Sequence, residues 1–159
     1  MSLPYEETLN GALLVRPPPG ARHELICARL HQIMHASVAN LTSTRLLLPR
    51  SPVRLTADTL VCPDLALVTV ATGKLWLAAE VVSSEDHASD TVVKKQIYEE
   101  LRLPRLWMVD PRYDNIEVYH ASPYGLVLKE ILAGREILSE KLLPEFQLTI
   151  TDLFLMPTS

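Results

Sequence analysis

Two apolar runs, residues 65–70 and 75–82, constrain the fold of this chain more than any other feature of its sequence. They are joined by Ala71-Thr72-Gly73, a short loop whose final glycine suits the left-handed position of a hairpin turn. Strands that are apolar on both faces belong in the middle of a sheet that is covered on both sides. We therefore expect an antiparallel hairpin buried inside a domain that also contains helices.

A carboxylate stands at the outer end of each run, Asp64 before the first and Glu80 within the second. A three-residue loop would pair Val70 with Lys74 and, counting outward, Asp64 with Glu80. Residues opposite each other in an antiparallel pair share a face and lie about 5 Å apart at Cβ, so two carboxylates there repel each other unless a cation lies between them. A hard divalent ion is the natural candidate. The hypothesis depends on register, because a slip of one residue sends the two carboxylates to opposite faces.

The chain of 159 residues is expected to form a single domain, 1–159, which is long enough to bury about two thirds of its unfolded surface. Residues 1–20 should be an N-terminal arm that ends in a proline-rich stretch, because consecutive prolines exclude regular structure. Residues 21–155 should form the core, beginning with a helix over residues 21–38 whose apolar side chains recur at helical spacing. His23 and Glu24, at the start of this helix, are candidates to line a cleft.

A second helix is expected over residues 89–103. Its predicted buried stripe, at 100° per residue, comprises Val93, Ile97 and Leu101. On this wheel Lys94 lies within about 60° of the stripe, whereas the adjacent Lys95 faces solvent. A buried ammonium is costly without a partner, and the carboxylates at the end of the sheet are the nearest candidates. Asp90 and Tyr98, one turn to either side, are placed to hold Lys94.

The remaining elements are expected to be strands. They cover residues 12–15 in the arm, 45–49 and 53–56, 105–110, a hairpin at 116–120 and 126–131, and a C-terminal pair at 137–143 and 148–155 that ends in a short helical turn. Together with the two helices, these strands predict a mixed α/β (α+β) fold.

Composition argues against several classes of protein. A formal net charge of −4 disfavours binding of nucleic acid by bulk electrostatic attraction. No apolar run approaches the roughly 18 residues of a membrane span, and the acidic N-terminus lacks a signal core, so we expect a cytoplasmic protein without a membrane partner. Cys27 and Cys62 are too few for a disulfide framework and are expected as buried thiols. His31 and His35 have the spacing of a two-histidine metal site but lack a third ligand, so a solvated helix face is expected.

Several motifs occur in an order and spacing that resemble a known family. They are Pro63-Asp64, Glu80-Val81-Val82-Ser83, the series Asp90, Lys94 and Tyr98, the segment LPRLWMVDP over residues 103–111, and Glu117-Val118-Tyr119. Over roughly residues 12–155 the chain resembles the putative restriction endonuclease family within the PD-(D/E)xK nuclease superfamily.

The resemblance implies a restriction-endonuclease-like core, in which helices flank a mixed central β-sheet, and hydrolysis of phosphodiester bonds that depends on Mg²⁺ or Mn²⁺. Carried onto this chain, Asp64 and Glu80 would be metal ligands, together with the backbone carbonyl of Val81. The lysine of the superfamily motif would fall at Val82 and is absent. The family places a lysine on the following helix instead, here Lys94, which would orient the attacking water or stabilise the pentavalent phosphorus.

Three functional hypotheses follow. The first is a metal-dependent endonuclease acting on DNA rather than RNA. The second is a catalytically inactive homodimer of nuclease fold that binds nucleic acid or protein, which the negative net charge and the missing lysine at Val82 favour. The third is a small-molecule phosphohydrolase, which would need a closed pocket. Since sequence-specific readout by a chain without an insertion needs two copies, we expect a homodimer.

Overall fold

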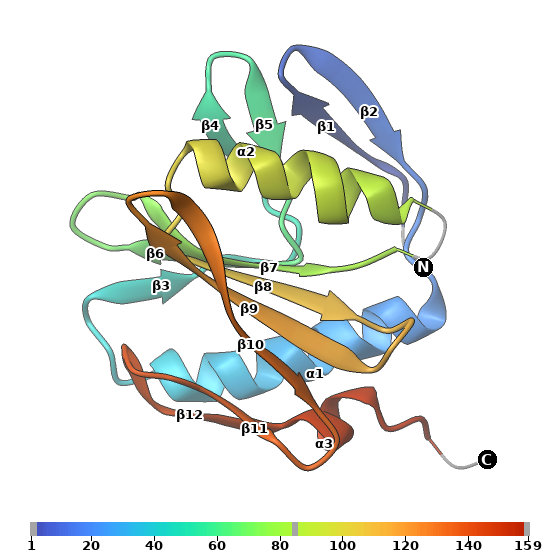
Figure 1. The fold of residues 1–159 in the computed structure, drawn as a ribbon, viewed down its shortest axis with the longest axis vertical. Helices are drawn as coiled ribbons and strands as arrows, with labels where there is room; N and C mark the ends of the chain where they lie inside the picture. The colour runs from blue at the N-terminus through green and yellow to red at the C-terminus, as the bar shows by residue number, and fades with distance from the viewer. Residues whose placement is uncertain (1–2, 84–85, 158–159) are drawn as a thin grey trace.

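The structure is a computed structural model that describes residues 3–83 and 86–157. Within these residues, a six-stranded sheet with the order β10-β9-β8-β7-β6-β3 forms the centre of the fold (Figure 1). Its strands are β3 (Thr44–Leu46), β6 (Leu65–Thr69), β7 (Leu75–Val81), β8 (Arg105–Asp110), β9 (Asn115–Ser122) and β10 (Gly125–Ala133). The pair β7–β8 is parallel and the other neighbours are antiparallel. The expected mixed central sheet is therefore confirmed.

Helices lie on both faces of this sheet, and each face has its own apolar core (Figure 1). The helix α1 (Ala21–Val38) has the bounds predicted from the sequence and packs on one face, where Met34, Leu77 and Trp107 are buried together. The second helical segment covers the other face, where Ala78, Val82, Ile97 and Leu106 are buried together. The apolar hairpin is thus covered on both sides, as its sequence predicts.

The N-terminal residues form a hairpin within a second sheet rather than the expected arm. The strands β1 (Tyr5–Leu9) and β2 (Ala12–Arg16) join β4 (Val53–Thr56) and β5 (Thr59–Val61) in the order β2-β1-β5-β4. Asn10 and Gly11 form the turn, with φ values of 52° and 84°, the left-handed pair that a tight hairpin requires. Only the strand β2 was predicted, because Asn10-Gly11 was not interpreted as a hairpin turn.

The register of the central hairpin reaches its predicted outer pairing through two shifts that cancel. The loop has four residues rather than three, because Thr69 N–H donates to the Lys74 carbonyl at 2.9 Å, so the predicted pairing of Val70 with Lys74 is wrong. A bulge between Leu67 and Val68 then shifts the register back, and Leu65 pairs with Ala79. Extending this ladder by one residue sets Asp64 against Glu80.

The second helical segment begins with π-helical turns, η1 (Ser89–Lys94), and continues as α2 (Lys95–Glu100). The predicted stripe is wrong at two positions, because Val93 and Leu101 are each 40% exposed. A π-helical turn contains more residues than an α-helical one, so the buried side chains recur every four residues. They are Asp90, Lys94 and Tyr98, together with the predicted Ile97.

This segment ends three residues before its predicted end at residue 103. Arg102 adopts a left-handed conformation with φ 56°, and Leu103 N–H donates to the Tyr98 carbonyl at 3.0 Å. This bond and the left-handed Arg102 close the last helical turn in the manner of a Schellman motif. Pro104 follows at once and prevents any continuation of the helix.

The C-terminal elements close the core on the side of α1 (Figure 1). They are β11 (Ile137–Glu140), β12 (Leu143–Thr149) and α3 (Ile150–Phe154). The expected final helical turn is present, but β12 begins before Pro144, which a two-stranded sheet tolerates because the proline lies on a strand with a free edge. Both cysteines are buried and free, as expected. Among the described helices, none combines the length and apolar character of a membrane span.

Candidate active site

Lys94 is the centre of a buried group of charged side chains between η1 and the sheet. Its Nζ lies 2.8 Å from Glu80 Oε2 and 2.7 Å from Glu7 Oε2. Lys94 and Glu80 are each 1% exposed, and Glu7 is 0% exposed. Tyr98 donates its hydroxyl hydrogen to Glu80 Oε2 at 2.7 Å. The helix, the central sheet and the N-terminal hairpin therefore meet at one ammonium.

The N-terminal hairpin contributes two members of this group, Glu7 from β1 and Arg16 from β2. Arg16 Nη1 donates to Glu7 Oε1 at 2.7 Å, and Arg16 Nη2 donates to both carboxylate oxygens of Asp90 at 3.0 and 3.1 Å. Asp90 was expected to hold Lys94, and the structure pairs it with Arg16 instead. The sequence analysis missed Glu7 and Arg16. The Asn-Gly turn was the available signal, because it predicts that the hairpin folds back on the core.

Asp64 lies at the other side of the site, against the start of α1. Its Oδ2 accepts a hydrogen bond from the Val81 N–H at 2.8 Å, and Arg50 Nη1 donates to its Oδ1 at 3.2 Å. Arg50 also donates to Glu24 Oε1 at 2.7 Å, which fixes the first turn of the helix. Arg50 was not predicted, and it follows a short strand with no pattern that marks it.

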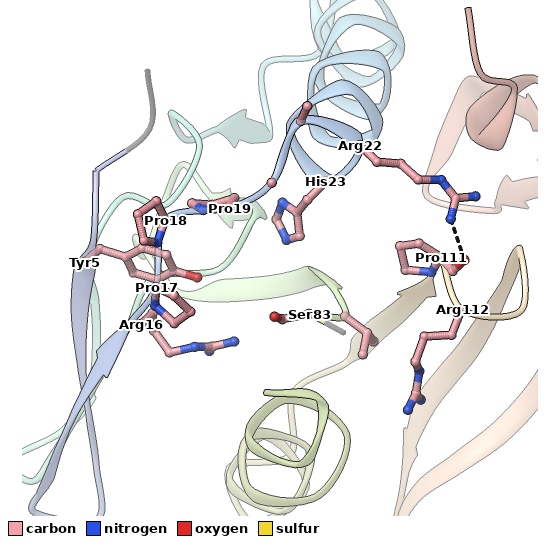
Figure 2. A pocket seen from close by; sticks show the side chains of 13 residues that line it. Tyr5, Arg16, Pro17, Pro18, Pro19, Arg22, His23, Ser83, Pro111 and Arg112 are labelled. Carbon is pink, nitrogen blue, oxygen red and sulfur yellow. Dashed lines mark hydrogen bonds between the residues drawn. The ribbon is translucent and has the colours of Figure 1, made fainter. Parts of the chain in front are cut away.

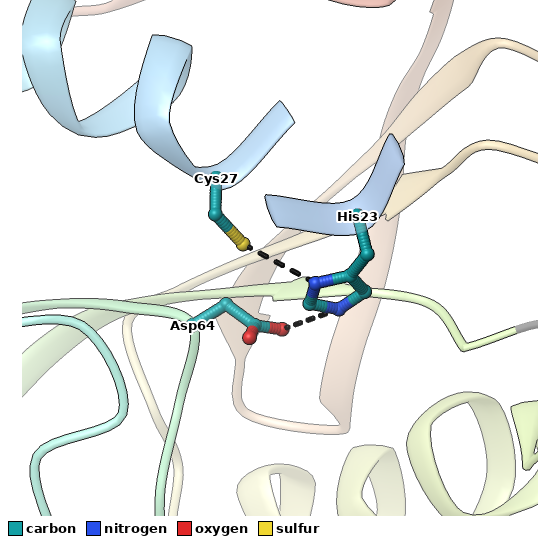
Figure 3. A group of neighbouring side chains, drawn as sticks. All are labelled: His23, Cys27 and Asp64. Atoms are coloured by element: carbon teal, nitrogen blue, oxygen red, sulfur yellow. Dashed lines mark hydrogen bonds and ion pairs between the residues drawn. The ribbon is translucent and has the colours of Figure 1, made fainter. Parts of the chain in front are cut away.

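His23 lies close to two of the three predicted oxygen ligands, Asp64 and the carbonyl of Val81. Its Nε2 is 3.6 Å from Asp64 Oδ2 and 2.9 Å from the carbonyl oxygen of Val81. Cys27 approaches the other ring nitrogen, with Sγ 3.6 Å from Nδ1 (Figure 3). His23, Cys27 and Asp64 have ligand atoms within 4.8 Å of one another. These three residues, together with the carbonyl oxygen of Val81, place oxygen, nitrogen and sulfur donors at the start of α1.

Electrostatics at this site favours an additional cation. The pKa of Glu80 is raised to about 8, first by burial and then by the nearby carboxylates of Asp64, Glu7 and Asp90, while Lys94 lowers it. Burial alone would lower the pKa of Lys94, yet Glu80 and its other anionic neighbours hold that pKa well above its usual range. The ammonium thus stays charged, while Glu80 retains a proton to unusually high pH. A cation placed between Asp64 and Glu80 would favour the charged form of Glu80.

A pocket of about 430 Å³ opens beside this group (Figure 2). Val82 and Ser83 after β7 line one wall, and Pro111 and Arg112 after β8 line another. The prolines of residues 17–19 and the first turn of α1, including Arg22 and His23, complete it. Arg22 Nη1 donates to the carbonyl of Pro111 at 2.8 Å. The pocket therefore brings basic side chains next to the carboxyl end of β7.

The seven side chains predicted for the site divide between these contacts. Lys94 and Tyr98 each contact Glu80, while Asp64, His23 and Glu24 gather around the start of α1 and Arg50. Asp90 joins the group through Arg16. His31, which was expected on a solvated face, instead places Nε2 2.6 Å from the backbone carbonyl of Asp64.

Comparison with known proteins identifies relatives of this chain. A family model described as Uma2, putative restriction endonuclease, matches residues 2–151. A crystal structure of a putative nuclease belonging to DUF820 from Anabaena variabilis ATCC 29413 superposes with a TM-score of 0.78. The two chains share 17% sequence identity, and the alignment covers 95% of this chain and 90% of that one. No match was found among curated proteins.

Proposed function

We propose that this chain, which belongs to the Uma2 family of putative restriction endonucleases, hydrolyses phosphodiester bonds in DNA, in preference to RNA, with the help of Mg²⁺ or Mn²⁺. The observation that carries the proposal is the buried pair of Lys94 and Glu80, 2.8 Å apart, on the hairpin register that sets Glu80 against Asp64. An acidic pair beside a lysine is the combination that metal-assisted phosphoryl transfer requires.

The donors present fit a hard divalent cation. Asp64, Glu80 and the carbonyl of Val81 would hold it, and all three offer oxygen atoms, which Mg²⁺ prefers. The pKa of Glu80 is raised first by burial and then by neighbouring carboxylates, and a dication would stabilise its charged form. When bound, the ion lowers the pKa of a coordinated water and offsets charge on the phosphate.

The residues of this chain would contribute orientation and charge. Lys94 would donate a hydrogen bond to the attacking water or to the oxygens that gain negative charge as the phosphorus becomes pentavalent. Tyr98 fixes the orientation of the Glu80 carboxylate through its 2.7 Å hydrogen bond. Arg50 and the Val81 N–H hold the carboxylate of Asp64, so both acidic groups are oriented before substrate arrives.

The pocket is the proposed path of the nucleic-acid backbone to this centre. Its lining includes Arg22 and Arg112, whose guanidinium groups are ion-paired with Asp114 and Asp110 in a chain whose net charge is −4. Arginine guanidinium groups match phosphate geometry. We also propose that the protein acts as a homodimer, because two copies would be needed to read a symmetric site. The expected cytoplasmic location stays a prediction.

An inactive nuclease-fold module, binding nucleic acid or protein as a homodimer, is the alternative. The observation that favours it is Val82, which is buried in the same apolar core as Tyr98, on the face of Glu80, where the superfamily lysine would stand. In this alternative the Lys94–Glu80 pair would serve stability alone.

Calorimetric titration with Mn²⁺, followed by nuclease assays on double-stranded DNA, single-stranded DNA and RNA, tests the proposal. Mn²⁺ should bind the wild type, and Asp64→Asn and Glu80→Gln should each abolish binding and cleavage. Lys94→Met should abolish cleavage while Mn²⁺ still binds, with Lys95→Met on the adjacent position as the matched control. A folded wild type without Mn²⁺ binding, or equal cleavage by the two lysine variants, would favour the inactive module.

A further inference from the structure

Glu7 is held from every direction by groups of the candidate site. Its Oε1 accepts from Arg16 Nη1 at 2.7 Å. Its Oε2 accepts from the backbone N–H of Cys62 at 2.7 Å and lies 2.7 Å from Lys94 Nζ. Both oxygens are engaged by cations or N–H donors, so Glu7 is fixed as a partner of Lys94.

Glu7 and Glu80 differ in their electrostatic surroundings, although both contact the same ammonium. Burial alone would raise the pKa of Glu7, but Lys94, the Cys62 N–H and Arg16 together lower it. The pKa of Glu80 is raised by burial and by its carboxylate neighbours. Of the two carboxylates beside Lys94, Glu7 is the one that a second cation, Arg16, and a backbone N–H also hold.

We propose that Glu7 is a positioning residue of the nuclease site, which holds the ammonium of Lys94 in place when the Glu80 carboxylate binds the metal ion. This inference rests on the proposed function, in which Glu80 is a metal ligand and Lys94 acts on the substrate. The N-terminal hairpin then completes the active site, and Arg16 fastens Glu7 to the same helix through Asp90.

The geometry explains why a second carboxylate is needed. Lys94 contacts Glu80 at 2.8 Å, and an ion that shares this carboxylate weakens its attraction for the ammonium. Without Glu7, Lys94 would compete with the ion for Glu80. With Glu7 at 2.7 Å, Lys94 keeps an anionic partner while Glu80 binds the ion.

The first test measures how firmly the ammonium is held, with no metal and no substrate. In ¹⁵N-labelled protein a buried, ion-paired lysine ammonium gives a side-chain NMR signal, which Lys94→Met assigns by its disappearance. Glu7→Gln, which keeps an oxygen for the Cys62 N–H, should broaden or remove this signal. Glu6→Gln, on the adjacent exposed position of β1, should leave it unchanged. An unchanged Lys94 signal in Glu7→Gln, or a wild type with no such signal, would overturn the proposal.

The second test compares Mn²⁺ affinity in two backgrounds. Glu7→Gln should weaken binding about 10- to 100-fold, the usual effect of removing an outer partner of a metal ligand. In the Lys94→Met background the same substitution should have at most a small effect, because the competing ammonium is gone. Equal losses in both backgrounds would show that Glu7 acts on the ion without Lys94 and would overturn the proposal.

Failure of folding would also be informative. If Glu7→Gln does not fold, the double variant Glu7→Gln/Lys94→Met, which removes both charges, should restore folding, because no unpaired ammonium is left. A double variant that also fails to fold would contradict the inference. A wild type whose Lys94 signal depends on Glu7 but which binds no Mn²⁺ would refute the proposed function alone and leave Glu7 as the residue that holds Lys94.

Discussion

Arg16 Nη2 lies 3.0 and 3.1 Å from the two carboxylate oxygens of Asp90, and this buried ion pair joins the N-terminal hairpin to the helix that carries Lys94. The same guanidinium binds Glu7, so one arginine holds two carboxylates that are themselves shielded from water. The position of Lys94 therefore depends on a hairpin far from it in the sequence.

Replacement of Arg16 by methionine should destabilise the protein by about 3–5 kcal/mol, because two buried carboxylates each lose a cationic partner. Urea unfolding followed by circular dichroism measures the loss. Arg54→Met, on an exposed position of β4, is the matched control and should change stability by less than about 0.5 kcal/mol. If the two variants are equally stable, the ion pair does not anchor the hairpin.

Replacement of Glu80 by glutamine should alter how stability depends on pH. The pKa of Glu80 is raised from 4.5 to about 8 in the folded protein, so the folded state binds this proton more tightly than the unfolded state. Its stabilising effect is fully present below pH 4.5 and is lost as pH rises through about 8. Without metal, the free energy of unfolding of Glu80→Gln should therefore rise relative to that of the wild type as pH increases from 5 to 9, by an amount on the order of a few kcal/mol.

Thermal unfolding of both proteins at several pH values checks this sign. Glu145→Gln, on an exposed position of β12, controls for the general effect of removing one negative charge. A constant difference between Glu80→Gln and the wild type across this range would show that Glu80 titrates near its ordinary value.

The parts of the fold that follow from local pattern could be predicted from the sequence. The apolar stripe of α1 fixes its bounds, and the doubly apolar hairpin fixes the middle of the sheet. The inward direction of Lys94 was predicted correctly, although its helical wheel assumed an α-helix where the chain forms π-helical turns. The outer pairing of Asp64 with Glu80 was reached by an incorrect count, because the longer loop and the bulge offset each other.

The residues that the sequence analysis missed are those whose role depends on long-range packing. Glu7 and Arg16 become parts of the site only when the hairpin folds onto η1, and Arg50 only when its loop meets the start of α1. A charged residue in a short strand resembles any solvated residue until its neighbours are known. Long-range partners of this kind leave no periodic signal in one sequence.

Replacement of Tyr98 by phenylalanine should remove one support of Glu80. The hydroxyl donates to Glu80 Oε2 at 2.7 Å in a fully buried setting, so its loss leaves the carboxylate short of a donor and should cost about 1–3 kcal/mol of stability. Mn²⁺ affinity should fall about tenfold, since the carboxylate is less well oriented. Tyr124→Phe is the control, because Tyr124 is 98% exposed. Equal affinities in the two variants would exclude an orienting role for Tyr98.

The affinity for Mn²⁺ should itself depend on pH in a way that Glu80 determines. Because Glu80 must lose its proton to act as a ligand, and its pKa is raised to about 8, affinity should rise roughly tenfold per pH unit below pH 8 and become constant above it. Calorimetry in two buffers of different ionisation enthalpy counts the protons released, and close to one should be released per ion bound at pH 7. An affinity that is constant between pH 6 and 8, with no proton released, would mean that the ion does not displace a proton from Glu80. Asp64 and Glu80 would then be balanced by the cations already in the chain, Arg50 and Lys94, and the argument for a metal ion at this site would lose its electrostatic basis.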